Sequence, residues 1–392
     1  MRLLLANDGV ADPGGVDTYL RAVVPALRSR GHDVAGLHYQ RAAGARPFAE
    51  PAFGVLDLGL ERAIDAVAAW QPDVCFSHNM HALEIDAALA RRWPLVKMMH
   101  GYFGTCVSGH KAHAWPARVP CAKRFGPACL AHFFPRRCGT ADPLRMWRQY
   151  GWARRQHTLI DDYAAIVVAS EHMRREYAAN GVSLERLHAL PLFAPGEVAA
   201  RPVRHDEDRV LFLGRMTDLK GGDILVRAIA HAVRALSRPI AVTFAGEGPA
   251  RRAWEAEARR LNVAAEFAGW LTPAGRDEAL SRATALAIPS VWPEPFGLVG
   301  LEAAARGVPS IAFDTGGVSE WLRDGVNGLM VRPAGDARAL AEAIARLLAD
   351  RTLHSGLAAG ALESARTMRL DRHVNALVTG VLEPAARRPV SV

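Results

Sequence analysis

The stretch from Val291 to Ile311, VWPEPFGLVGLEAAARGVPSI, sets two carboxylates, Glu294 and Glu302, among apolar and small residues. Carboxylates are rarely buried without a partner, so this pair indicates either a site that accepts hydrogen bonds from ligand hydroxyls or two capping or surface glutamates. The preceding run ALAIPS predicts a buried strand, and the following residues predict a helix that begins near Leu298 and ends at Gly307. Glu294 is therefore expected in the loop after a strand, and Glu302 about one turn into the next helix.

Apolar runs alternate with amphipathic segments on both sides of this stretch. Strands are expected at 2–7, 73–79, 94–103, 162–170, 210–216 and 284–290, and helices at 16–32 and 222–236. Such alternation is typical of a parallel sheet covered on both faces. A chain of 392 residues also exceeds the size at which one core keeps growing. The sequence predicts an α/β protein with two Rossmann-like, doubly wound domains that face each other across a cleft.

Domain limits follow from composition. The segment 190–209 is rich in proline and then charged, which is typical of a linker. We expect a first domain at 1–195 and a second at 196–370. A helix at about 371–392 is expected to pack back on the first domain. The first domain carries a cysteine-rich insert at 104–140.

Ligands of doubly wound sheets bind outside the carboxyl ends of the strands, so the loops there are expected to hold the chemistry. Gly14 and Gly15 precede a helix and can expose backbone N–H groups to an anion, or simply form a turn. Arg215 and Lys220 follow a strand and can clamp a diphosphate from two sides; the alternative is two surface cations near a turn. Together with two carboxylates that accept hydrogen bonds from hydroxyls, these loops suit a nucleotide sugar.

Three segments carry a family resemblance. They are GRMTDLKGGDILVRAI, EPFGLVGLEAAARGVPSIAFDTGGVSEWLRDGVNGLMV with its Glu-x7-Glu spacing, and PGGVDTYLRAVVPALRSRGHDV near the amino terminus. In this order they resemble the retaining GT-B glycosyltransferases of the family-four type, the glycosyl transferases of group 1. The resemblance extends over most of the chain and is strongest over 210–335.

The resemblance implies transfer of a sugar, with retention of configuration, from a UDP- or GDP-linked donor to an acceptor hydroxyl. The acceptor would be a glycan or lipid-linked, in glycan, exopolysaccharide or glycolipid synthesis, and catalysis would require no cofactor or metal. The catalytic residues would be His100, Arg215, Lys220 and Glu294. The donor would be bound by Gly14, Gly15, Gly214, Arg215, Lys220, Trp270, Glu294, Phe296, Gly297, Leu298, Val299 and Glu302. Among these, the family places diphosphate at the two cations, sugar hydroxyls at Glu294, ribose at Glu302 and the nucleobase near Trp270.

Four of the five cysteines lie in the insert: Cys106, Cys121, Cys129 and Cys138. Four thiolates in a proline- and glycine-rich segment can hold one structural Zn²⁺ in place of a hydrophobic core. Their spacing lacks the paired Cys-x2-Cys of common zinc sites. Packed thiols and disulfides therefore stay open as alternatives.

Charge is unevenly distributed. Ten Lys and Arg stand against one acid between His110 and Arg155, in a chain of net charge +8. This segment favours an anionic partner, or it is a solvated face. The expected helix from Pro143 mixes arginines with Trp147 and Trp152, which suits peripheral contact with an anionic membrane or packing of the aromatics on the sheet.

Other classes of function are less well supported by the sequence. No recognised nucleic-acid-binding module is present, so binding through the basic segment 110–155 is the weaker alternative. A sugar-nucleotide epimerase or hydrolase on the same fold is the nearer one. No signal peptide and no apolar run of membrane-spanning length are found, so a cytoplasmic location is expected, with peripheral membrane contact on that side.

Overall fold

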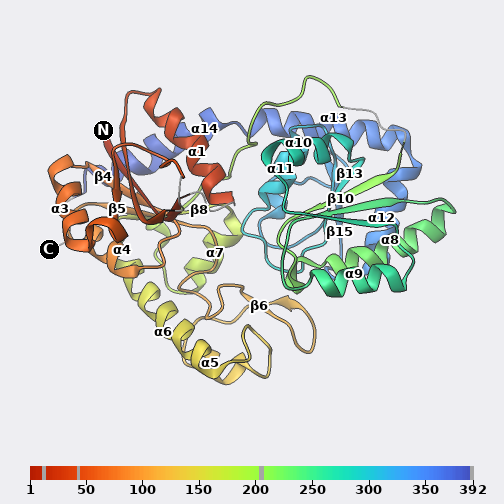
Figure 1. Cartoon of the computed structure of the whole chain (residues 1–392), viewed down its shortest axis with the longest axis horizontal. Coiled ribbons are helices and arrows are strands. Elements are labelled where there is room, and N and C mark those ends of the chain that lie inside the picture. The colour runs from red at the N-terminus through yellow and green to blue at the C-terminus, as the bar shows by residue number, and fades with distance from the viewer. Residues whose placement is uncertain (11–14, 42–44, 203–206, 389–392) are drawn as a thin grey trace. The chain divides into compact units, whose positions relative to one another are not determined.

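The structure is a computed structural model that describes residues 1–10, 15–41, 45–202 and 207–388. The chain divides into two compact units, which Figure 1 draws together. Unit 1 consists of Met1–Lys111, Ala122–Leu192 and Leu370–Val392, and unit 2 of Ala112–Cys121 and Phe193–Arg369. Part of the predicted insert therefore belongs to unit 2, although the residues on either side of that part belong to unit 1.

Unit 1 is built on a parallel sheet with the strand order β3-β2-β1-β4-β5-β8-β9. Its strands are β1 (Arg2–Val10), β2 (Asp33–Arg41), β3 (Ala52–Gly54), β4 (Val74–Ser77), β5 (Leu95–Met99), β8 (Ala165–Val168) and β9 (Leu187–Ala189). Every residue of β4, β5 and β8 is buried. Continuous burial of this kind is expected for parallel strands that have helices on both faces.

The helices of unit 1 are α1 (Gly15–Arg28), α2 (Val55–Leu58), α3 (Leu60–Trp70), α4 (Leu83–Ala90), α5 (Ala128–Phe133), α6 (Pro143–Leu159), α7 (Glu171–Ala179), α14 (Leu370–Leu377) and α15 (Glu383–Ala386). Short turns of 3-10 helix cover Ile160–Asp162 and Leu184–Arg186, and a π-helical stretch covers Val378–Leu382. Helix α14 packs against α1, where the Tyr19 hydroxyl lies 2.9 Å from His373 Nε2. The end of the chain thus completes the unit that holds its beginning.

Unit 2 has a second parallel sheet, with the order β12-β11-β10-β13-β14-β15. Its strands are β10 (Arg209–Leu213), β11 (Ala241–Ala245), β12 (Ala265–Gly269), β13 (Ala285–Ile288), β14 (Ser310–Phe313) and β15 (Gly328–Val331). A separate antiparallel hairpin joins β6 (Ala112–His113) to β7 (Val119–Pro120).

The helices of unit 2 are α8 (Gly222–Leu236), α9 (Arg251–Arg260), α10 (Pro273–Arg282), α11 (Leu298–Ala304), α12 (Ala337–Ala349) and α13 (Arg351–Thr367), with 3-10 turns at Asp218–Lys220 and Val318–Glu320. In Figure 1, α8, α9 and α12 gather on one face of the sheet, and α10, α11 and α13 gather on the other. Buried side chains of α8 and α12 close the core against β10, β11 and β14.

The residues expected to form a linker are partly packed on unit 2. Phe193 and Ala194 are buried, and the Ala194 N–H donates to the carbonyl of Met368 at 2.9 Å. Ala199 N–H likewise donates to the carbonyl of Ala305 at 2.8 Å. This proline-rich stretch is therefore held to unit 2 by backbone hydrogen bonds at Ala194 and Ala199.

In both sheets the strand order reverses next to the first strand of the unit. The neighbours at this point are β1 and β4 in unit 1, and β10 and β13 in unit 2. In open doubly wound sheets, ligands bind in the crevice outside the carboxyl ends of the strands at this switch point. The loops after these four strands are therefore where a site is expected.

Candidate functional site

Two loops meet at the switch point of unit 2, one after β10 and one after β13. The carbonyl of Leu219 accepts hydrogen bonds from the N–H groups of Val291, at 2.9 Å, and Trp292, at 3.2 Å. Gly221 has a φ of +70°, and a Cβ at this position would lie 2.0 Å from the carbonyl oxygen of Pro289. Only glycine fits this approach without strain. The glycine therefore brings the turn that carries Lys220 down onto the end of β13.

This approach pairs Lys220 with Glu294. Lys220 Nζ lies 2.6 Å from Glu294 Oε1, and the ammonium also lies 4.6 Å from the centre of the Trp292 ring. The Glu294 side chain is only 5% exposed, whereas that of Lys220 is 24% exposed. A buried carboxylate is thus neutralised by a cation that still reaches solvent, and the face of an aromatic ring adds a further attraction for that cation.

The Glu294 backbone is held by a glycine pair farther along the chain. Gly316 has a φ of +59°, and a Cβ there would lie 2.2 Å from the Glu294 carbonyl oxygen. The Gly317 N–H donates to that same oxygen at 2.7 Å. In the sequence this pair belongs to a family motif but carries no role of its own; the structure shows that it supports the loop of Glu294.

Glu302 lies on α11 and is buried. Its Oε1 lies 3.2 Å from Arg276 Nη1, and its Oε2 has no hydrogen-bond partner among the residues that the structure describes. Burial raises the pKa of this carboxyl, against the opposing charges of Arg276 and Arg306. A buried acceptor without a partner is costly, so Oε2 is a position at which a ligand hydroxyl would be stabilised.

The start of α11 joins the two glutamates. Gly297 precedes the helix with a φ of +87°, and Leu298 and Val299 begin it. The first N–H groups of a helix have no acceptor within the helix and are available to an anion. Phe296 is buried, and its carbonyl accepts a hydrogen bond from Trp321 Nε1 at 2.7 Å. Trp321 therefore fixes the backbone at this point.

The other predicted donor residues are more loosely placed. Arg215, directly after Gly214, is exposed, and its guanidinium makes no hydrogen bond or ion pair within the described ranges. Trp270 follows β12 and is 55% exposed. In unit 1, Gly15 is the first residue of α1, while Gly14 lies outside the described residues.

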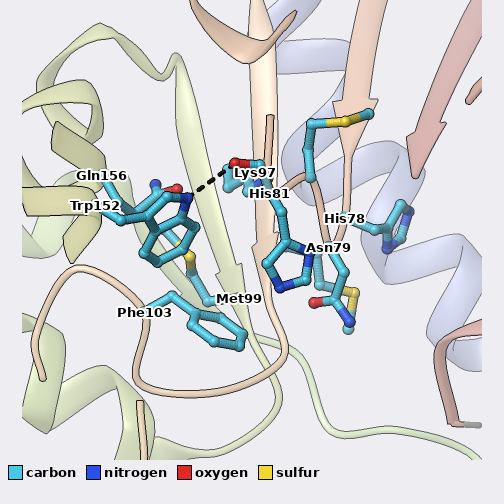
Figure 2. A pocket seen from close by; sticks show the side chains of 10 residues that line it. His78, Asn79, His81, Lys97, Met99, Phe103, Trp152 and Gln156 are labelled. Carbon is cyan, nitrogen blue, oxygen red and sulfur yellow. Dashed lines mark hydrogen bonds between the residues drawn. The ribbon is translucent and has the colours of Figure 1, made fainter. Parts of the chain in front are cut away.

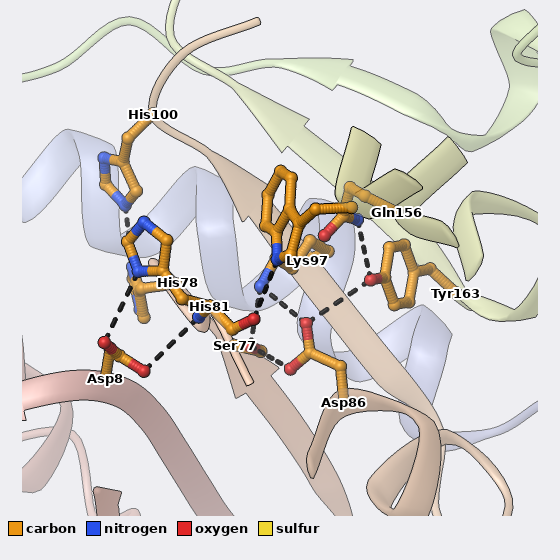
Figure 3. Close-up of polar contacts among 10 residues, drawn as sticks. Asp8, Ser77, His78, His81, Asp86, Lys97, His100, Gln156 and Tyr163 are labelled. Atoms are coloured by element: carbon orange, nitrogen blue, oxygen red, sulfur yellow. Dashed lines mark hydrogen bonds and ion pairs between the residues drawn. The ribbon is translucent and has the colours of Figure 1, made fainter. Parts of the chain in front are cut away.

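Unit 1 carries a second group of polar side chains, at the carboxyl ends of its strands. His100 follows β5, and His78 follows β4; His100 Nε2 lies 3.0 Å from His78 Nδ1 (Figure 3). His78 is 1% exposed, and its Nε2 has no partner among the described residues. Asp8 lies near the carboxyl end of β1, and its carboxylate is 3.4 Å from the ring of His81. His78 was not predicted, because a single histidine after a strand carries no spacing signal.

Burial, with the nearby charge of Lys97, keeps both histidines neutral. It lowers the pKa of His100 to about 3, and burial together with His100 and Lys97 lowers the pKa of His78 well below its ordinary value. A neutral imidazole pair has one N–H in the hydrogen bond that joins the rings. His100 can then donate or accept through its other nitrogen without carrying a charge.

Acidification is expected to destabilise the folded protein through these histidines. Below about pH 6.5 the unfolded chain binds protons that the folded state excludes, so stability falls as the pH falls. Between about pH 7.5 and 5.5 this loss is about 1.4 kcal/mol for each such histidine. Urea unfolding at the two pH values should show a loss smaller by this amount in His78→Asn, but an unchanged loss in Asn79→Ala. Equal losses in wild type and His78→Asn would contradict the assignment.

A buried ion pair lies beneath these histidines. Lys97 Nζ is 2.6 Å from Asp86 Oδ2 and 3.0 Å from Ser77 Oγ, and both charged side chains are at most 4% exposed (Figure 3). Ser77 Oγ donates to the other oxygen of Asp86 at 2.5 Å. The Tyr163 hydroxyl, which accepts from Gln156 Nε2, also lies within reach of Asp86, at 3.3 Å. No sequence pattern predicted this network, which anchors α4 to the strands.

A small cavity opens beside the network. Its volume is about 10 Å³, enough for about one water. Figure 2 shows Phe103 and Trp152 on one side of it and His81, Asn79 and His78 on the other. Trp152 Nε1 donates to the carbonyl of His81 at 2.8 Å, which holds the indole against the strand ends.

The insert contains the four cysteines for which a structural zinc site was predicted. Within the described part of the chain, no three His, Cys, Asp or Glu side chains are grouped so as to hold a metal. All five cysteines are present as thiols. Cys129 and Cys138 pack on a small apolar cluster of Val107, Phe133 and Met146, while Cys121 belongs to unit 2. A local hydrophobic core therefore supports the insert where the sequence suggested a metal.

The fold is shared with solved structures. Both doubly wound sheets are matched by HepE of Anabaena, solved in complex with UDP and glucose. The TM-score is 0.70 at 18% identity, over 98% of this chain and 100% of that one. A sucrose-phosphate synthase from Thermosynechococcus elongatus gives a TM-score of 0.72 at 19% identity, over 99% and 100%. The architecture is that of the GT-B glycosyltransferases.

Sequence comparison gives the family. Residues 207–350 match the family described as glycosyl transferases group 1. A D-inositol 3-phosphate glycosyltransferase of Nocardia farcinica is 27% identical over 88% of this chain and 80% of its own length. One from Nocardioides sp. is 33% identical over 51% of this chain, which spans about half, 48%, of that relative. The resemblance predicted from the motifs is confirmed over residues 207–350.

Proposed function

We propose that this protein is a retaining glycosyltransferase that moves a sugar from a nucleotide diphosphate to an acceptor hydroxyl. One observation carries the proposal: Lys220 and Glu294 are joined at the switch point of unit 2, and Glu302, with its unpartnered oxygen, lies about one turn into the helix α11 that follows. A cation for a diphosphate and two carboxylates for hydroxyls are what a nucleotide sugar requires. The match of residues 207–350 to the glycosyl transferases of group 1 supports the same class of reaction.

The proposed roles follow the family motifs. Lys220 and Arg215 bind the diphosphate, and Arg215 is suited to this because its guanidinium has no protein partner in the described ranges. Glu294 binds hydroxyls of the transferred sugar, and Glu302 Oε2 accepts from the ribose. The remaining contacts are assigned to Gly14, Gly15, Gly214, Trp270, Phe296, Gly297, Leu298, Val299 and, near the sugar, His100.

In the proposed reaction the bond between the anomeric carbon and the diphosphate oxygen breaks as the bond to the acceptor oxygen forms on the same face. The leaving phosphate oxygen takes the proton of the acceptor hydroxyl. Negative charge grows on the diphosphate, and the two cations with the N–H groups at the start of α11 stabilise it where it develops. These groups supply the charge for departure, so the proposal routes no step through a metal.

The donor is proposed to be a UDP- or GDP-linked sugar. UDP is supported by the HepE structure, which contains UDP and glucose. A thermal-shift series with UDP, GDP and ADP and their sugars identifies the donor, because a ligand of the folded state raises its melting temperature. Transfer to an acceptor, with the anomeric configuration read by NMR, then tests the reaction. Inverted product would overturn retention, and turnover of donor without acceptor would favour an epimerase or hydrolase.

The acceptor is proposed to be a glycan or a lipid-linked glycan at the cytoplasmic face of an anionic membrane. Helix α6 has no acidic residue, and its exposed face combines Leu144 and Trp147, 69% and 56% exposed, with Arg145 and Arg148. Exposed apolar side chains among arginines are typical of a surface that contacts anionic lipid. Among the described residues, no helix is both long and apolar enough to cross a membrane.

Vesicle binding tests this surface. Wild type should sediment with phosphatidylglycerol vesicles at low salt and much less with phosphatidylcholine, because the attraction is screened by salt and needs lipid charge. Leu144→Ser/Trp147→Ser should weaken binding several-fold. Leu184→Ser, at a position 54% exposed elsewhere in unit 1, serves as the control. Equal sedimentation of wild type and the double variant would contradict a membrane role for α6.

A further inference from the structure

A short hairpin within the predicted insert is fastened to unit 2. Strands β6 and β7 pair Ala112 with Pro120 and His113 with Val119. The segment 112–121 belongs to unit 2, while the residues before and after it belong to unit 1. The hairpin is therefore a part of unit 2 that the chain supplies from the middle of unit 1.

Arg118, in the loop of this hairpin, binds the hairpin to the start of α8 and the turn before it. Its Nη1 donates to Asp223 Oδ1 at 2.9 Å and to the carbonyl oxygen of Asp218 at 2.7 Å, and its Nη2 donates to Asp223 Oδ2 at 2.6 Å. The two side chains of the pair are 26% and 21% exposed. A two-pronged bond from guanidinium to carboxylate is both strong and directional. Arg227 also donates to Asp223, at 3.0 Å.

The two aspartates bracket the turn that carries Lys220. Asp218 begins the 3-10 turn that ends at Lys220, and Asp223 lies in the first turn of α8. The turn itself is closed by hydrogen bonds from the Lys220 N–H to Thr217, at 2.9 Å, and from the Gly221 N–H to Asp218, at 3.3 Å. Arg118 thus ties the beginning of the turn to the helix that follows it.

The base of the hairpin is closed by Lys111, whose side chain is 3% exposed. Lys111 Nζ donates to the carbonyl of Lys123 at 2.5 Å and pairs with Glu176 Oε2, on α7, at 3.1 Å. This contact joins the two chain segments that enter and leave the hairpin.

We propose that Arg118 is a positioning residue for the donor site, which holds the Asp218–Asp223 turn so that the Lys220 ammonium stays against Glu294. The donor role of Lys220 rests on the proposed function; the ordering of the turn does not. Without Arg118 the turn loses the bond to the Asp218 carbonyl and the two-pronged bond to Asp223, so the ammonium is no longer preorganised. Preorganisation of such a charge is what makes it effective toward a diphosphate.

Hydrogen exchange of the backbone tests the structural part without any activity. In Arg118→Ala, amides of residues 217–222 should exchange at least about tenfold faster than in wild type, while amides of β13 stay protected. Arg118→Lys, which keeps one cationic donor, should restore part of the protection. Arg124→Ala serves as the control, because Arg124 is an exposed arginine of the same insert. Wild-type exchange of residues 217–222 in Arg118→Ala would overturn the proposal.

Binding and kinetics test the positioning role. Arg118→Ala should weaken UDP or GDP binding by about tenfold in calorimetry and raise the KM for the donor while that for the acceptor is unchanged, with partial rescue by Arg118→Lys. A general loss of structure would change both KM values and the melting temperature. Unchanged donor affinity with faster exchange would overturn the role in positioning. If wild type binds neither nucleotide, the proposed function fails, and hydrogen exchange still decides whether Arg118 orders the turn.

Discussion

Lys220→Ala is expected to lower kcat by about 100-fold or more, the range found when one preorganised electrostatic contact to a transition state is removed. The structure supplies the reason, because the ammonium is already held 2.6 Å from a buried carboxylate and against the ring of Trp292. Steady-state kinetics with the donor identified by thermal shift measures the effect. The loss should be found in kcat more than in the KM for the acceptor.

Two further variants test whether the loss is specific to the Lys220–Glu294 pair. Glu294→Gln should also lose about 100-fold, since an amide keeps the shape but neither pairs with the ammonium nor accepts from a sugar hydroxyl as strongly. Lys123→Ala removes an exposed lysine of unit 1 and should leave turnover unchanged. Circular dichroism must show each variant folded, because Lys220→Ala leaves the Glu294 carboxylate without its cation. Near wild-type kcat in a folded Lys220→Ala would refute the assignment of the donor site.

Asp86→Ala is expected to have the largest effect on stability, about 3–5 kcal/mol lost from the free energy of unfolding. The substitution leaves the buried Lys97 ammonium with only the Ser77 hydroxyl as a partner in the described network. The free-energy cost of removing a charge from water is far larger than the stabilisation from one hydrogen bond to a hydroxyl. Urea unfolding near neutral pH measures the loss.

A double variant distinguishes the cost of an unpaired buried charge from the contribution of the ion pair itself. In Asp86→Leu/Lys97→Met both charges are removed, and stability should return to within about 1–2 kcal/mol of wild type, since a buried pair can be replaced by apolar side chains of similar size. Asp161→Ala breaks the pair of Arg186 with a carboxylate that is 82% exposed, and should cost no more than about 1 kcal/mol. A cost below about 1 kcal/mol for Asp86→Ala would show that Lys97 is not confined to the network.

The positions of the loops in unit 2 could be predicted because they are local. Strand, loop and helix follow each other along the chain between 284 and 307, so periodicity and helix-end signals place Glu294 and Glu302 correctly. The pairing of Lys220 with Glu294 joins residues 74 positions apart. It depends on Gly221 meeting the carbonyl of Pro289, an approach that no local pattern encodes.

The residues that could not be found from the sequence act through long-range contacts. Arg276 and Gly316 reach the two glutamates from other elements, and His78 reaches His100 across neighbouring strands. The surroundings of the cysteines depend on long-range contacts in the same way. Their spacing allowed a metal site, but the fold assigns Cys121 to unit 2 and packs Cys129 and Cys138 on apolar side chains.

The chain returns to unit 1 after residue 369, so a truncation at the carboxyl end removes part of unit 1. A truncated chain that stops at the end of α13 would contain every residue of the proposed donor site, yet it would lack the buried His373, Val374 and Leu377 of α14. The face of α1 around Tyr19 would then be open to water, and the damage would appear in the unit that carries His100. Deleting the last elements of the sequence is in effect a core mutation of the first ones.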